Sequence, residues 1–292
     1  MDLSIVIVSW NVRDKLRDNL KALFQSEGDF SYEVIVVDND SADDTVKMVE
    51  TEFSLVEVVE NSYNAGFARG CNLGINMATG DFILLLNPDM RVFPDTLKNM
   101  LDWMRANPQA SVAGCHLVTE TGETMPHVRR FPTAWNQLAV VLKIPHIFSH
   151  ALDKYLCVDF DYSKAAKVDS IRGGFFMVNM LSDNKPLFWM DERYFLWFDE
   201  VDYCKKVYNG HNGSNKGEVW YTPAAKCIDY VGQSFKQVGT IKKQLYFRNS
   251  MLKYFKKWHP YWQYLLLKAA WPIGLTLTFV LGKLNVKSKA KT

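Results

Sequence analysis

Several features that mark common protein classes are missing from this sequence. The first glycine is Gly28, so no glycine-rich phosphate loop follows the apolar segment at residues 3–9, which disfavours a dinucleotide-binding oxidoreductase. The five cysteines are irregularly spaced without a CxxC pair; this disfavours a zinc site or a disulfide framework and is typical of the reducing cytoplasm. No signal peptide is expected, because Met1 is followed almost at once by a β-branched apolar segment.

Acidic residues are missing from the C-terminal end of the chain. After Asp229 there is no Asp or Glu, whereas twelve Lys and Arg follow. The first 229 residues carry 22 basic and 32 acidic side chains, a net charge of −10, although the whole chain has +2. An acidic body with a basic, aromatic tail predicts an anionic surface as partner, either a membrane or nucleic acid.

The apolar residues that are present suffice for a folded α/β protein. A hydrophobic content of 48% over 292 residues excludes a mostly disordered chain. Apolar segments at residues 3–9, 34–37, 55–59 and 82–86 alternate with segments of helical periodicity. Strands that alternate with helices predict a mainly parallel, doubly wound sheet.

Polar residues follow the predicted strands at the point where each strand ends. Trp10 and Asn11 follow the first strand, Asp38 ends the second, and Asn-Pro-Asp at 87–89 follows the fourth. Ligands of open α/β sheets bind at this edge. A carboxylate with an amide two residues earlier suits a hard divalent cation that also holds phosphate oxygens. Because Asn, Pro and Asp also form turns, a simple turn at 87–89 is the alternative.

Four motifs occur in register along the first 90 residues. They are Val8-Ser9-Trp10-Asn11, the segment VVDNDSAD at 36–43, Asn64-Ala65-Gly66-Phe67-Ala68 and Leu86-Asn87-Pro88-Asp89. Together they resemble the family 2 inverting glycosyltransferases of GT-A fold, especially the rhamnosyltransferase-like branch, over about residues 3 to 255. The resemblance implies transfer of a sugar from a nucleotide diphosphate-sugar, and the branch alone suggests dTDP-rhamnose.

The resemblance also implies which residues bind the donor and a metal. Ten residues would form the nucleotide-sugar site: Ser9, Trp10, Asn11, Asp38, Asp40, Asn64, Gly66, Phe67, Asn72 and Asn87. Asn87 stands where the family has the first acid of its D-x-D motif, so Asp89 would be the main charged ligand of Mg²⁺ or Mn²⁺. Asp229 stands where relatives often have a metal-site histidine and is the second predicted ligand.

Arginine and glycine residues of the second half are predicted to line the acceptor site. Arg130 belongs to a basic pair that precedes Phe131. Adjacent arginines can hold a phosphate, although a solvated pair is the plainer alternative. Gly173 and Gly174 permit close approach of the backbone to an acceptor sugar. With Trp197, these residues form the predicted acceptor site.

Three carboxylates within four residues mark the predicted catalytic segment. Asp199, Glu200 and Asp202 follow a run of aromatic residues. Acids are also favoured at any helix N-terminus, so ordinary helix-start acids are the alternative. An inverting transfer needs a base that removes the proton of the acceptor hydroxyl. In the family the second acid of the pair usually has this role, which assigns the base to Glu200, with Asp199 as the alternative.

The tail combines aromatic residues with lysines. Five of its residues fall on one helical face: Phe247, Met251, Tyr254, Phe255 and Trp258. This helix either packs on the body or meets a membrane. Residues 261–281 are interrupted by Lys268, Pro272 and Gly274 and contain no uncharged run of the ~20 residues that a spanning helix needs. A helix in an anionic membrane interface is therefore favoured over a spanning or re-entrant hairpin.

The sequence thus predicts two parts and one leading function. Residues 1–240 form the GT-A domain, with a nucleotide-sugar half at 1–110 and an acceptor half at 111–240, and residues 241–292 form a membrane-associated helical region. We expect a peripheral enzyme on the cytoplasmic face of the cell membrane that extends a lipid-linked or cell-surface glycan. The alternative is a non-catalytic GT-A-like scaffold that binds sugar nucleotide or glycan. Nucleic acid is disfavoured, since much apolar tail surface would stay exposed.

Overall fold

The computed structural model describes residues 1–181, 189–210, 215–230 and 238–283. Within these residues, eleven strands are present: β1 Leu3–Ser9, β2 Tyr32–Asp38, β3 Val56–Glu60, β4 Phe82–Leu86, β5 Met90–Val92, β6 Ala110–Val118, β7 Val128–Arg129, β8 Ala166–Lys167, β9 Ser170–Ile171, β10 Phe175–Asn179 and β11 Glu218–Asp229. Nine of them form one sheet in the order β3-β2-β1-β4-β10-β6-β11-β5, with β8 paired to β11, whereas β7 pairs with β9 alone.

The central sheet is mixed rather than purely parallel. β1 pairs in parallel with β2 and β4, and β6 pairs in parallel with β11. β10 lies antiparallel between β4 and β6, and β5 and β8 run antiparallel to β11. The predicted, mainly parallel α/β sheet is thus confirmed, and three of its nine strands are reversed. A strand buried on both faces, such as β10, is continuously apolar in either direction, so the sequence pattern carries no sign of its reversal.

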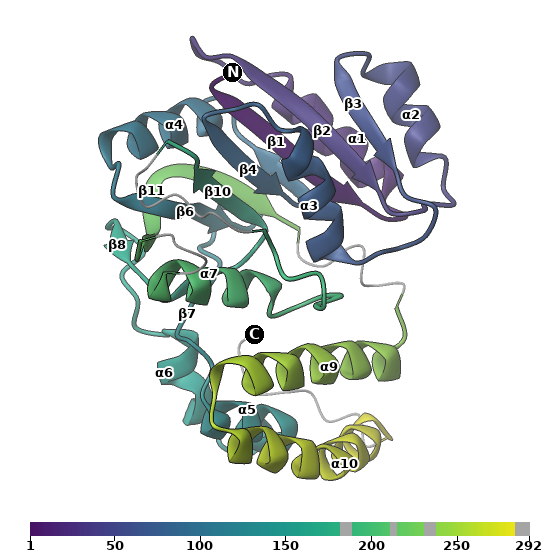
Figure 1. Cartoon of the computed structure of the whole chain (residues 1–292), viewed down its shortest axis with the longest axis vertical. Coiled ribbons are helices and arrows are strands. Elements are labelled where there is room, and N and C mark those ends of the chain that lie inside the picture. The colour runs from purple at the N-terminus through teal and green to yellow at the C-terminus, as the bar shows by residue number, and fades with distance from the viewer. Residues whose placement is uncertain (182–188, 211–214, 231–237, 284–292) are drawn as a thin grey trace.

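Helices cover both faces of the sheet (Figure 1). The described helices are α1 Arg13–Leu23, α2 Thr45–Glu52, α3 Phe67–Met77, α4 Thr96–Ala106, α5 Ala134–Val141, α6 Asp153–Leu156, α7 Asp199–Asn209, α9 Thr240–Trp258 and α10 Tyr261–Lys283, with short 3₁₀ turns at Ile144–His146 and Ser149–Leu152. α1, α2 and α4 contribute to the core on one face, and α3 and α7 to the core on the other.

Side chains of β1 alternate between these two cores. Leu3, Ile5 and Ile7 lie in the core with α1, whereas Val6 and Val8 lie in the core with α3. This period of two is the geometry of a strand that is buried on both faces. Both cores hold β1 in register, so the polar residues that follow it emerge at one defined edge of the sheet.

A third apolar cluster joins the C-terminal helices to the body. Met251, Tyr254 and Phe255 of α9 are fully buried, and they pack with Phe198 and with Trp271 of α10. Of the two roles considered for the apolar face of this helix, packing on the body is the one observed. α10 lies beside α5 at the end of the molecule that is farthest from the sheet (Figure 1).

Candidate active site

A cavity of about 400 Å³ opens at the edge where β1 and β4 end. Eleven of the predicted site residues line it: Trp10, Asn64, Gly66, Phe67, Asn87, Asp89, Gly173, Gly174, Trp197, Asp199 and Glu200. Residues that are far apart in the sequence therefore line one cavity. The ends of the strands form one of its walls, and the start of α7 forms another.

Two buried oxygens lie beside the cavity at the ends of β1 and β2. Asp38 is 3% exposed, and its Oδ2 accepts a hydrogen bond from the Ser41 amide at 2.8 Å. Burial raises the pKa of Asp38, although the hydrogen bonds from Ser41 oppose this. Within the described residues, Asp38 Oδ1 and Ser9 Oγ have no hydrogen-bond partner. Buried acceptors of this kind need a partner, which a nucleoside N–H or hydroxyl would provide.

Besides Ser9 and Asp38, three further predicted donor-site residues do not line the cavity. Asn11 ties two loops together, because its Oδ1 accepts from the Ala42 amide at 2.7 Å. Asp40 is exposed at a φ of 63°. The Asn72 side chain is buried, where it accepts from the Met190 amide at 2.9 Å and donates to the Met190 carbonyl at 3.0 Å. Asn72 thus braces α3 against the segment before α7.

The loop that opens α3 fixes the opposite wall of the cavity. Gly66 has a φ of +88°, and a Cβ added there would lie 2.6 Å from the Phe195 carbonyl oxygen. The Phe67 amide donates to that same oxygen at 3.0 Å. Only glycine fits at position 66, because any side chain would separate α3 from the segment that leads into α7.

Asp89 and Asp229 lie close to each other, but only Asp89 lines the cavity. Asp89 is 4% exposed, and its carbonyl accepts from the Tyr230 amide at 3.2 Å. Asp229 pairs with Met90 across β11 and β5, and its Oδ2 lies 3.2 Å from Nη1 of Arg172, which does line the cavity. The sequence pattern identified Asp229 without its arginine partner.

The oxygen donors at this edge fit a divalent cation that is shared with a ligand. In the described part of the chain, no group of three or more His, Cys, Asp or Glu residues could hold a metal ion by itself. The Asp89 carboxylate and the Asn87 amide are hard donors in one cavity. Mg²⁺ sites of few protein ligands are completed by water and substrate phosphates. The donor set therefore fits a cation held together with a diphosphate.

Gly173 and Gly174 lie between the predicted metal ligands after β4 and the acids Asp199 and Glu200. A Cβ on Gly173 would lie 3.4 Å from the Glu200 Cβ, and a Cβ on Gly174 would lie 3.7 Å from the Asn87 Nδ2. The backbone N–H of Asn87 donates a hydrogen bond to the Gly174 carbonyl at 2.9 Å. Two residues without side chains thus form the part of the cavity between Asn87 and Glu200, and they leave room for a ligand there.

A strained turn aims the acidic pair at the cavity. Trp197 and Phe198 have φ values of 61° and 65°, both in the left-handed region. Each such residue costs of order 1–3 kcal/mol and persists only where its surroundings determine it. Phe198 is 4% exposed, and its ring lies 5.5 Å from each of the Phe247 and Tyr254 rings of α9. Packing against α9 therefore holds the turn from which α7 begins.

Asp199 and Glu200 form a hydrogen-bonded pair of carboxyls. Burial raises the pKa of Asp199 well above its usual range, and the charge of Glu200 and a hydrogen bond between the two side chains act in the same direction. Asp199 is 2% exposed, whereas Glu200 is half-buried on the cavity wall. A hydrogen bond between two carboxyls requires a proton, and burial favours the protonated form of Asp199. Glu200, the less buried of the two acids on the cavity wall, is then the acceptor of that hydrogen bond.

The raised pKa of Asp199 makes stability depend on pH. The pKa of Asp199 in the folded protein lies above 3.8, the value for an unperturbed Asp. The contribution of this carboxyl to stability is therefore complete below pH 3.8 and is lost as the pH rises through the folded pKa. We expect the melting temperature of Asp199→Asn, relative to wild type, to increase from about pH 4 to pH 8. Differential scanning calorimetry tests this. Asp81→Asn, at an exposed acid, is the control, and an equally flat difference for both variants would contradict the raised pKa of Asp199.

Arg130 lies apart from this cavity. Its Nη1 is 3.7 Å from Oδ1 of Asp169, and its side chain is 61% exposed. With Arg129, Lys154 and Asp159 it lines a second cavity of about 360 Å³. The structure therefore does not bring Arg130 together with Gly173, Gly174 and Trp197, which all line the first cavity.

α9 contributes two cavity residues that the sequence analysis did not select. Lys242 and Tyr246 line the cavity, and the Tyr246 ring stacks on Phe195 with centroids 4.5 Å apart at 23°. They are four residues apart and so lie on one face of the helix. α9 begins at Thr240, where the sequence analysis divided catalytic domain from tail. The domain boundary remains a prediction, but the tail takes part in the cavity.

Comparison with known proteins identifies relatives of this chain. Residues 4–159 match the family model described as glycosyl transferase family 2. The uncharacterized glycosyltransferase YfnE of Bacillus subtilis is 35% identical over 98 residues, which cover 32% of this chain but only a quarter (25%) of that relative. The amylovoran biosynthesis glycosyltransferase AmsE of Erwinia amylovora is 20% identical over 229 residues, 74% of this chain and 79% of AmsE.

A solved structure extends the similarity to nearly the whole fold. The mannosyltransferase PcManGT from Pyrobaculum calidifontis, solved in complex with GDP-Man and Mn²⁺, superimposes with a TM-score of 0.58. The match covers 96% of this chain and 75% of that chain at 17% identity. At this identity the similarity concerns the fold.

Proposed function

The chain belongs to glycosyl transferase family 2 and has a GT-A fold, and from this premise we propose that it is an inverting, metal-assisted glycosyltransferase. It transfers a sugar from a nucleotide diphosphate-sugar to a hydroxyl of a lipid-linked or cell-surface glycan. One observation carries the proposal: an ionisable carboxylate, Glu200, and a metal-type carboxylate, Asp89, line the same cavity. The relative AmsE, whose name refers to amylovoran biosynthesis, supports an acceptor of polysaccharide type.

The strand ends bind the donor in this proposal. Trp10 lines the cavity and offers an aromatic face to the nucleobase of the donor. Asp38 Oδ1 and Ser9 Oγ accept hydrogen bonds from the nucleoside. Asp89 and Asn87 would hold Mg²⁺ or Mn²⁺ together with the diphosphate. When bound, the cation would neutralise the charge that develops on the leaving diphosphate.

Glu200 acts as the general base. Inversion requires the acceptor hydroxyl to attack the anomeric carbon from the side opposite the leaving diphosphate, and its proton must be accepted there. The glycine pair at 173–174 leaves room for the sugar between Asn87 and Glu200. Protonated Asp199 donates its hydrogen bond to Glu200 and so holds the carboxylate in one orientation.

A ligand screen tests the proposed function. We expect one nucleotide diphosphate-sugar to raise the melting temperature in the presence of Mn²⁺, since a ligand stabilises the state that binds it. dTDP-rhamnose is the first candidate from the branch resemblance, and UDP- and GDP-hexoses form the rest of the panel. With the donor identified, ¹H NMR of the transfer product should show inverted anomeric configuration. A retained configuration would contradict the role of Glu200.

We also propose that the protein attaches to the inner face of the cell membrane through α10. Large apolar residues recur at helical spacing on the exposed side of this helix: Tyr261, Trp262, Leu265, Ile273 and Phe279. Lys268 lies exposed on the same helix. Across the described ranges, no helix has the length and hydropathy to cross a bilayer. The lysines at 287, 289 and 291, which the sequence adds to this basic region, lie outside the described residues.

Liposome flotation tests the membrane contact. The triple variant Trp262→Ser, Ile273→Ser, Phe279→Ser should lose at least about tenfold in affinity for anionic vesicles, because burial of one large apolar side chain contributes about 1.5–3 kcal/mol. All three positions are more than half exposed, so the fold should survive. Serine at Leu55 and Tyr63, which are exposed elsewhere, is the control. Wild-type protein that ignores anionic vesicles would end this proposal.

A further inference from the structure

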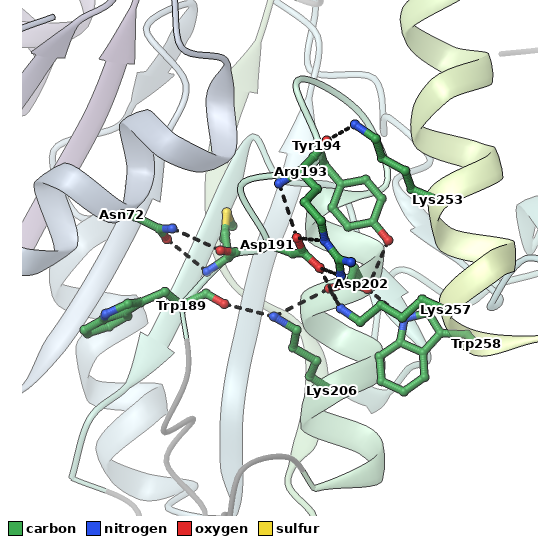
Figure 2. A network of polar contacts seen from close by, with 11 residues as sticks. Asn72, Trp189, Asp191, Arg193, Tyr194, Asp202, Lys206, Lys253, Lys257 and Trp258 are labelled. Carbon is green, nitrogen blue, oxygen red and sulfur yellow. Dashed lines mark hydrogen bonds and ion pairs between the residues drawn. The ribbon is translucent and has the colours of Figure 1, made fainter.

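The third acid of α7, Asp202, is fully buried and strongly bound. Its Oδ1 accepts hydrogen bonds from Trp258 Nε1 at 2.7 Å and from the Tyr194 hydroxyl at 3.2 Å. Its Oδ2 accepts from Lys257 Nζ at 2.8 Å and lies 3.6 Å from Lys206 Nζ. Figure 2 shows these side chains converging on Asp202 from α7, α9 and the segment before α7.

Two of the four side chains that contact Asp202 come from the tail. Because an unpaired buried carboxylate is costly, the loss of one of these partners should destabilise the position of Asp202. Lys257 and Trp258 form the last turn of α9, more than 50 residues from Asp202 in sequence. The helix dipole at the start of α7 adds to the stabilisation of the Asp202 charge.

Lys257 also binds the segment that leads into α7. Its Nζ lies 3.0 Å from Asp191 Oδ2, and hydrogen bonds from Arg193 and Lys257 hold the pKa of Asp191 well below its usual range in spite of its burial. Asn72 fixes the neighbouring residue Met190 to α3. Lys257 thus joins α9 both to Asp202 in the first turn of α7 and to Asp191 in the segment that leads into α7 (Figure 2).

From these contacts we infer that Lys257 and Trp258 are positioning residues for the reaction: through Asp202 they hold the first turn of α7, and with it Glu200. The Asp202 amide donates to the Phe198 carbonyl at 2.8 Å, so Asp202 lies in the same turn as Glu200 and closes it onto the strained residue. The inference rests on the proposed function, because it gives the tail a role in the base's geometry.

A loosened turn should affect turnover more than donor binding. Donor residues at the strand ends, such as Trp10 and Asp38, are not part of the Asp202 network. A displacement of a reacting group by about 1 Å can cost roughly 10²-fold in rate. We therefore expect Lys257→Met to lower kcat about ten- to hundredfold with KM for the donor changed less than about threefold.

The experiment compares Lys257→Met and Trp258→Phe with Lys256→Met, an exposed neighbour on the same helix. Circular dichroism first establishes that each variant is folded, and Lys257→Arg, which keeps the charge, should recover most of the turnover. A folded Lys257→Met with kcat within twofold of wild type would overturn the inference.

Hydrogen exchange separates this inference from the proposed function. Amides of residues 197–204 should exchange at least tenfold faster in Lys257→Met and Trp258→Phe than in wild type, and should be unchanged in Lys256→Met. Unchanged exchange in all variants would refute the positioning role even if the enzyme is active. Wild-type protein without turnover on any donor would refute the proposed function, while the exchange data would still decide whether Lys257 holds the turn.

Discussion

Glu200→Gln is expected to lower kcat by about 10²–10⁴-fold, the range typical of a lost general base. Glutamine keeps the size and polarity of the side chain but cannot accept the proton of the acceptor hydroxyl. Donor affinity should change little, because Glu200 lies at the start of α7 and the predicted nucleoside contacts lie at the strand ends. Steady-state kinetics and nucleotide-sugar titration measure the two quantities separately.

Asp199→Asn is the matched comparison for the base. The amide of asparagine retains a hydrogen-bond donor toward Glu200, as protonated Asp199 does. Its turnover should therefore stay well above that of Glu200→Gln. If instead only Asp199→Asn loses turnover while Glu200→Gln stays near wild type, the base is Asp199 and the assignment is wrong by one residue.

Asp89→Ala should remove the metal-dependent part of turnover, a loss of at least about 10²-fold, since one lost group that stabilises transition-state charge typically costs 10²–10³. Because Asp89 is buried, circular dichroism first establishes that the variant is folded. Calorimetric titration of Mn²⁺ in the presence of nucleoside diphosphate reports cation binding apart from activity.

Asp81→Ala is the control for the metal prediction. Asp81 precedes the same strand, β4, at its opposite end, and it is exposed. It should bind Mn²⁺ and turn over as wild type does. Full activity of Asp89→Ala, or full activity of wild type in excess chelator, would remove the metal from the mechanism.

The sequence predicted the parallel half of the sheet because its strands and helices alternate with clear periods. β1, β2 and β4 each contain an uninterrupted run of at least four apolar residues and are followed by or end in polar residues, so both the strands and the ligand edge were readable. The reversed course of β10 was not, because a fully buried strand has the same pattern in either direction. The sheet order beyond β4 depends on long connections, for which no local pattern exists.

The candidate site was readable only where a motif is local. Trp10, Asn87 and Asp89 follow strands directly, and Asp199 and Glu200 form one short acidic segment. Lys242 and Tyr246 reach the cavity from a helix whose packing depends on Phe198 and Tyr254, and this tertiary contact leaves no signal in the sequence. For the same reason, the family resemblance assigned Asn72 to the donor site, whereas its buried side-chain amide binds Met190.

The most direct test of the account is release of nucleoside diphosphate from the donor that the thermal screen identifies, measured for wild type with Mn²⁺ and with excess chelator, with and without a glycan acceptor. The account predicts slow metal-dependent hydrolysis without acceptor and faster release with it, both strongly reduced in Glu200→Gln and Asp89→Ala. Donor binding without any release of nucleoside diphosphate under all conditions would contradict it and would identify the protein as a sugar-nucleotide-binding scaffold.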